Sequence, residues 1–157
     1  MPHDRLTPEG QKFFREIEKL KKLQVRVGYQ EGEKTYDEGG KPVDLLDVAM
    51  FNELGTSRTP SRPFMRDSVD DNADKISSAC KSKLKALASG QKTAEQVLKE
   101  LGVMQVGLVQ ATIRDGEFAP NAPSTIARKG SDKPLIDTGQ MRQSVHYVIT
   151  EKNRGGD

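Results

Sequence analysis

The length, composition and charge of the chain exclude several classes of protein. Its 157 residues include 25 Lys and Arg against 23 Asp and Glu, so it lacks the basic excess with which DNA-condensing proteins bind duplex DNA. With 34% hydrophobic and 31% charged residues, it is predicted to fold as a single domain, residues 1–157, with a wide polar surface. No run approaches the ~20 apolar residues of a membrane span and no apolar signal core is present, so we expect a cytoplasmic protein without membrane contact.

The first predicted elements are a helix and a strand. Thr7 and Pro8 indicate the start of the helix, because Thr caps helices and Pro is favoured at their first position. Four apolar residues at helical spacing give it one apolar face: Phe13, Phe14, Ile17 and Leu20. Residues 24–29 then alternate apolar and polar side chains, which predicts a half-buried strand.

The next segment, up to residue 63, is predicted to contain one short helix between two irregular stretches. Residues 30–42 are rich in Gly and charge, which favours a flexible loop or a hairpin arm. Asp44 can cap a short helix that ends at Gly55. Residues 56–63 contain two prolines and are predicted to form a rigid, basic, extended connector.

Two long helices are predicted in the middle of the chain. The first covers residues 65–87, where apolar residues step by three or four along a single stripe: Met65, Val69, Ala73, Ile76, Cys80, Leu84 and Leu87. Gly90 ends it, and Thr93 with Gln96 forms a capping box for the second. The second is apolar on more than one side over its later half, so we expect it to pack between layers there. Its glycines, Gly102 and Gly107, indicate places where another backbone passes close.

The C-terminal part is predicted as a long irregular loop, a short helix and a strand. The loop covers residues 116–134, Asp137 can cap a helix of one or two turns, and residues 145–149 are apolar and β-branched. The elements together predict an α+β fold, with a small antiparallel sheet packed against a long helical pair and with extended loops or arms. Two strands alone make a marginal sheet, so residues 30–42 or a neighbouring subunit could supply more strands.

The residues that carry out catalysis or bind metals are poorly represented. Cys80 is the only cysteine, and on the apolar stripe it is predicted to be a small buried hydrophobe. His3 and His146 are the only histidines, too few for a closed metal site. The acidic pairs Asp70-Asp71 and Asp44/Asp47 are explained by the helix dipole. We therefore predict no catalytic residues, no cofactor and no metal.

Two stretches resemble a family of bacteriophage proteins. The first runs over residues 48–65 and contains Asn52, Glu53, Gly55 and then Arg62-Pro63-Phe64. The second runs over residues 119–145 and contains Pro134-Leu135-Ile136 followed by Asp137-Thr138-Gly139. Together they resemble the neck, tail-completion and virion-morphogenesis proteins of long-tailed phages, including the minor tail protein Z type. The resemblance covers roughly residues 24–150.

The resemblance implies a non-enzymatic virion protein in the head–tail connector, needed for joining head and tail. Such a subunit would assemble in the host cytoplasm and remain in the neck or upper tail of the virion. The implied partners are other copies in a homo-oligomeric ring, other neck and tail proteins, and, transiently, genomic DNA in the lumen.

The motif residues also have local explanations, because Gly55 can end a helix in a left-handed conformation and Asp137-Thr138-Gly139 can cap and turn the chain. We expect Arg62-Pro63-Phe64 to hold the chain extended while Phe64 anchors the next helix. Partner or lumen contacts are expected instead from the irregular segments, through five basic residues: Arg58, Arg62, Arg128, Lys129 and Lys133. Two alternatives remain open, a nucleic-acid-binding regulator that uses Arg58, Arg62, Arg66 and the Arg128-Lys129 pair, and a small enzyme that uses the aspartates.

Overall fold

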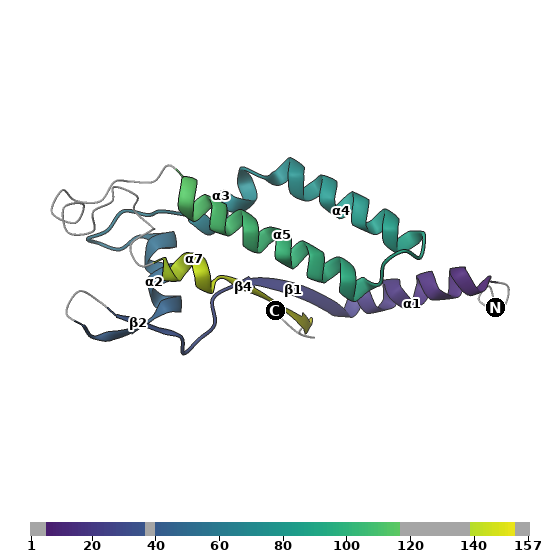
Figure 1. Cartoon of the computed structure of the whole chain (residues 1–157), viewed down its shortest axis with the longest axis horizontal. Helices are drawn as coiled ribbons and strands as arrows, with labels where there is room; N and C mark the ends of the chain where they lie inside the picture. Colours follow the sequence, from purple (N-terminus) through teal and green to yellow (C-terminus); the bar gives the residue numbers. More distant parts are fainter. Residues whose placement is uncertain (1–5, 37–39, 117–138, 153–157) are drawn as a thin grey trace. The chain divides into compact units, whose positions relative to one another are not determined.

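The computed structural model describes residues 6–36, 40–116 and 139–152 (Figure 1). The predicted loop at 116–134 lies almost wholly outside these ranges, and Arg128, Lys129, Lys133, Asp137 and Thr138 lie outside them entirely. The chain divides into two compact units, and the single domain over residues 1–157 stays a prediction. Unit 1 contains Met1–Val27, Ala73–Met104 and Tyr147–Asp157, and unit 2 contains Gly28–Asn72 and Gln105–His146.

Unit 1 combines helices with a two-stranded antiparallel sheet. Its elements are α1 (Pro8–Lys22), β1 (Leu23–Gly28), α4 (Ala73–Ala88), the first half of α5 (Ala94–Asp115) and β4 (His146–Glu151). β1 pairs with β4 (Figure 1). The core centres on three buried residues of α4 and α5: Leu87, Ala94 and Val97. Partly buried apolar residues of α1 and α5 pack against them: Phe13, Ile17, Leu20 and Leu101. Three of the four residues predicted for the apolar face of the first helix thus contribute to this core, but Phe14 is 45% exposed.

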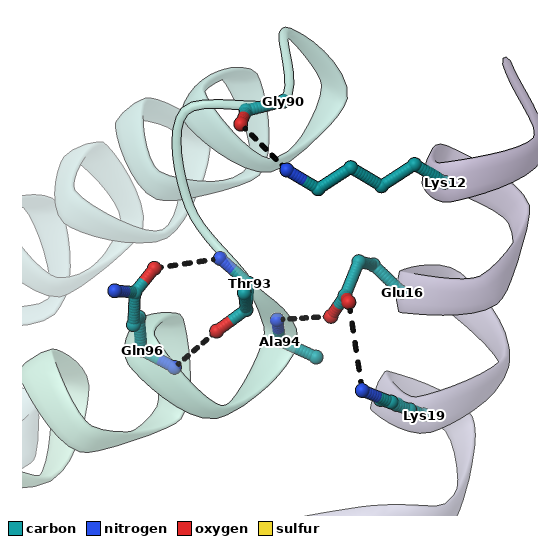
Figure 2. A network of polar contacts seen from close by, with 7 residues as sticks. All are labelled: Lys12, Glu16, Lys19, Gly90, Thr93, Ala94 and Gln96. Atoms are coloured by element: carbon teal, nitrogen blue, oxygen red, sulfur yellow. Dashed lines mark hydrogen bonds and ion pairs between the residues drawn. The ribbon is translucent and has the colours of Figure 1, made fainter. Parts of the chain in front are cut away.

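A polar network joins α1 to the turn between α4 and α5 (Figure 2). Thr93 and Gln96 form the predicted capping box, since Thr93 N donates to Gln96 Oε1 at 2.9 Å and Gln96 N donates to Thr93 Oγ1 at 3.2 Å. The buried carboxylate of Glu16 accepts a hydrogen bond from Ala94 N at 2.7 Å. Lys12 Nζ donates to the carbonyl of Gly90 at 3.2 Å. One helix thus places an acid at the start of α5 and a base near the end of α4, as their dipoles favour.

Unit 2 consists of a β-hairpin, three short helices and the second half of α5. Its elements are β2 (Lys34–Tyr36), β3 (Pro42–Asp44), α2 (Leu45–Leu54), α3 (Phe64–Asp70), the second half of α5 and α7 (Gln140–Ser144). β2 and β3 are antiparallel, with Thr35 opposite Val43. Seven buried apolar residues form its interior: Leu45, Ala49, Phe64, Val109, Ile113, Met141 and Val145.

The predicted α+β class is confirmed, but the described strands form two sheets and not one. Of the two structures predicted for residues 30–42, a loop or a hairpin, the structure has the hairpin, whose second strand continues to Asp44. Asp44 caps α2 as predicted, because its Oδ1 accepts from Leu46 N at 3.1 Å.

The prediction of one unbroken helix over residues 65–87 is wrong. The chain leaves the helix at Asp71 and Asn72, so that α3 ends at Asp70 and α4 begins at Ala73. The side-chain amide of Asn72 donates to Ser68 O at 2.9 Å, and its backbone nitrogen donates to Val69 O, three residues back. Asp and Asn compete in this way with regular helical bonding, and three of them follow one another here.

The helix α5 only partly follows its prediction. In its later half Val109 and Ile113 are buried, whereas Val106 and Leu108 are only half-buried. A Cβ at Gly102 would lie 2.7 Å from Tyr147 Cγ, so its close neighbour is an aromatic side chain and not the predicted backbone, while Gly107 has nothing within 4 Å. Within the described ranges, no helix has both the length and the apolar character needed to cross a bilayer.

Candidate functional site

The first motif of the sequence folds into one structure, which we call the α2–α3 junction (residues 52–64). α2 ends at Gly55, and α3 begins at Phe64 after Pro63, whose side chain provides no cap. The cap comes from Glu53, whose Oε2 accepts from Met65 N at 2.8 Å and whose Oε1 accepts from Arg66 N at 3.1 Å. A carboxylate satisfies two unpaired donors and favours the helix dipole at this position. The last turn of α2 thereby stabilises the first turn of α3.

The connector folds back against the end of α2. Ser61 Oγ donates to Glu53 O at 2.7 Å, and Arg62 N donates to Asn52 O at 2.6 Å. Gly55 has φ +76° and ψ 168°, and a Cβ there would lie 2.8 Å from Ser61 N. Only glycine combines this backbone conformation with so close a neighbour.

The prediction of an extended connector is wrong for its first half. Thr56 and Thr59 exchange backbone hydrogen bonds of 2.9 and 3.4 Å, which closes a tight turn. Thr56 Oγ1 supports the turn by accepting from Arg58 N at 3.2 Å and Thr59 N at 3.0 Å. A Thr hydroxyl that bonds the following backbone favours such a turn over an extended chain.

Phe64 anchors the junction in the interior of unit 2. It is fully buried, and the Tyr29 ring meets it edge-on with 6.3 Å between ring centroids. Tyr29 Oη donates to Met141 O at 2.8 Å, which ties the cluster to α7. Burial, and then the nearby charges of Glu33 and Glu53, raise the pKa of Tyr29, so the phenol remains a proton donor at neutral pH.

The outer face of α2 carries large apolar side chains where a surface helix ordinarily carries polar ones. Its inner face buries Leu45 and Ala49. Four exposed residues form its outer face: Asp47, Met50, Phe51 and Leu54. Of these, Met50 is 48% exposed, Phe51 56% and Leu54 71%. Exposed apolar residues gathered on one face of an element are typical of a surface that binds a partner.

The root of the hairpin is fixed to α7 by side chains. Ser144 Oγ donates to Glu33 Oε1 at 2.7 Å, and Gln140 Nε2 donates to Lys34 O at 2.9 Å. α7 follows Gly139, which takes a left-handed conformation with φ +69°. Beyond this root, Tyr36 at the end of β2 is 68% exposed.

The structure describes two of the five basic residues predicted to contact a partner, Arg58 and Arg62, and these two differ in exposure. Arg58 is exposed, whereas Arg62 is 7% exposed, and burial lowers the pKa of its guanidinium. The burial of Arg62 does not favour contact with a phosphate in a lumen, so for this residue the role remains a prediction. Among the described residues, no group of three or more His, Cys, Asp or Glu is arranged to hold a metal ion. Cys80 is half-buried and not fully buried as predicted.

The sequence reasoning missed the outer face of α2 and the capping role of Glu53. A signal for the first was present, since residues 45–54 are apolar around the whole helix and not along one stripe. Glu53 offered no local signal, because its partners lie 12 and 13 residues further on.

Comparison with known proteins adds no relative. No protein-family model, no curated protein and no solved structure matches this chain.

Proposed function

We propose that this chain is a structural subunit of the head–tail connector of a long-tailed bacteriophage, a neck or tail-completion protein needed to join head and tail. It would act as one copy in a ring, without catalysis, and would assemble in the host cytoplasm before becoming part of the virion. Its partners would be further copies and other neck and tail proteins.

The α2–α3 junction supports the proposal because the residues that carry the resemblance depend on one another there. Asn52, Glu53 and Gly55 belong to one part of the motif, and Arg62, Pro63 and Phe64 belong to the other. Glu53 caps the helix that Phe64 anchors, and Asn52 O accepts from Arg62 N. The two parts therefore form one folding module and are not two unrelated short matches.

The outer face of α2 is the single observation that carries the proposal. Asp44 caps α2 at one end, and hydrogen bonds of the α2–α3 junction hold the other end, so both ends of the helix are fixed within unit 2. Its exposed Met50, Phe51 and Leu54 offer an apolar surface suited to a stable assembly. An apolar patch on a rigid element is expected of a building block that must bind its neighbours.

Deletion of the gene from the phage or prophage that encodes it tests the proposal. We expect electron micrographs of the lysates to show separate heads and tails in place of joined particles, and infectivity to be lost. Expression of the intact chain in trans should restore both. Infectious, joined particles formed without this chain would refute the proposal.

The outer face of α2 can be tested in the same complementation assay. Phe51→Glu should fail to restore joining, because it places a charge in an apolar contact. The matched control is Val103→Glu on α5, since the two side chains are almost equally exposed, at 56% and 54%. Both variant proteins should give the circular dichroism spectrum of the unchanged chain.

A further inference from the structure

Asp47 is the charged residue that sets the electrostatic character of the outer face of α2. No basic residue occurs in α2. The other two acids of this region are engaged, because Asp44 caps α2 and lies 3.8 Å from Lys34 Nζ, and Glu53 caps α3. Asp47 is exposed beside the apolar side chains. The face is therefore apolar with a negative charge, and it favours a partner surface that is apolar with positive charge.

Pairing of α2 with α2 of another copy is disfavoured by charge. A two-fold contact brings two copies of the same acidic surface together, and neither α2 carries a basic residue to offset the two Asp47 carboxylates. A different surface, one that carries positive charge, is therefore favoured as the partner.

A complementary surface lies on α4 of the same chain. Lys81, Leu84 and Lys85 are exposed, and their spacing of three and four residues places them on one face of the helix. Leu84 is 46% exposed. From residue 75 to the end of α4 there are four lysines and no acid. Lys83 approaches Glu100 at 3.6 Å, whereas Lys81 and Lys85 form no ion pair with any described residue.

We propose that the outer face of α2 in one copy docks on the Lys81–Leu84–Lys85 face of α4 in a second copy. Leu84 meets Met50, Phe51 and Leu54, and the two lysines flank Asp47. Because the two surfaces differ, each copy contacts one neighbour through its α2 face and another neighbour through its α4 face. This is the head-to-tail contact from which closed rings are built. The inference rests on the proposed function and names the contact that would form the ring.

Charge exchange tests the contact on the full chain. Sedimentation velocity should show an assembly that weakens at least about tenfold with Asp47→Lys, or with Lys81→Glu combined with Lys85→Glu. The variant with all three changes should assemble again, because the charges are opposite once more. A control with the same change of net charge, Lys75→Glu with Lys99→Glu, should assemble like the original chain, since both lysines are exposed but lie off the proposed face.

Mixing two defective chains distinguishes head-to-tail from two-fold contact. Phe51→Glu removes the α2 face and Leu84→Glu removes the α4 face, so neither variant should assemble alone. Mixed together, they retain one intact pair of faces and should form a two-chain complex and nothing larger. Assembly of Leu84→Glu alone would show that α2 docks elsewhere and would overturn the inference.

Two further results would also overturn the inference: a chain that stays monomeric at every concentration tested, and a triple charge variant that does not recover. The phage complementation assay separates this failure from failure of the proposed function. If the Asp47→Lys chain still joins heads to tails while deletion of the gene does not, the connector role stands and only the docking surface is wrong.

Discussion

The carboxylate of Glu16 accepts a hydrogen bond from the backbone nitrogen of Ala94, which lies 78 residues further along the chain, at 2.7 Å. Glu16 is 7% exposed and Ala94 is fully buried, so water does not satisfy this nitrogen in its place. Glu53 provides the same arrangement at α3 in the other unit. In each unit, a Glu from an earlier helix thus completes the first turn of a later one.

Replacement of Glu16 by Ala is expected to lower the free energy of unfolding by about 1.5–3 kcal/mol, because it leaves a buried donor without a partner. Urea denaturation followed by circular dichroism measures the effect. The control is Glu18→Ala on the same helix, where the ion pair with Lys21 joins side chains that are 60% and 68% exposed. That variant should differ by less than about 0.5 kcal/mol, and an equal loss in both would contradict the capping role.

Glu53→Ala should destabilise unit 2 by about 1–3 kcal/mol, because two amide groups at the start of α3 lose a charged acceptor. Native-state hydrogen exchange of Met65 and Arg66 provides the measurement, since these amides should exchange faster. Asp47→Ala, an exposed acid on the same helix, should change stability by less than about 0.5 kcal/mol. Unchanged protection of both amides in the Glu53 variant would show that the cap is not needed.

Gly55→Ala is expected to cost about 2–4 kcal/mol, because the strained backbone conformation and the contact with Ser61 N act together. Gly32→Ala provides the comparison, since Gly32 has a similar φ of +86° but nothing within 4 Å of its added Cβ. Its expected cost is about 1–2 kcal/mol, from conformation alone. Thermal unfolding of both variants measures the difference, and equal costs would show that the close contact contributes nothing.

Replacement of Gly102 by Ala and replacement of Gly107 by Ala, both in α5, should change the free energy of unfolding in opposite directions. At Gly102 the new methyl group meets the Tyr147 ring near its attachment point, which cannot easily move, so we expect a loss of about 1–3 kcal/mol. At Gly107 the position is open, and Ala should raise stability by about 0.5–1 kcal/mol through its helix propensity. Chemical denaturation of the pair measures both, and two changes of the same sign would contradict the packing of Tyr147 on α5.

Local signals in the sequence predicted most helix and strand ends. Thr7, Asp44, Thr93 and Gly55 all cap or end helices as expected, because each acts on residues within a few positions of itself. The break between α3 and α4 was missed because apolar spacing continues across it. The run Asp70-Asp71-Asn72 was the contrary signal, since these residues favour turns over helix interiors.

The candidate site was harder to predict because it depends on contacts between distant residues. The caps at Ala94 and Met65 come from Glu16 and Glu53, and no spacing rule connects such pairs. The outer face of α2 also depends on tertiary packing. The sequence places the apolar residues Leu45 and Leu54 in the same short helix, but the fold buries Leu45 and leaves Leu54 71% exposed.

The network of Figure 2 has a consequence for the way the protein is made. During translation, α1 leaves the ribosome before the residues that it packs against have been joined to the chain. Until Val97 has been added, its apolar side chains have no core to enter, and Glu16 has no amide to cap. The nascent chain therefore carries an uncovered amphipathic helix until more than half of its residues have been joined, a period in which chaperone binding favours a correct product.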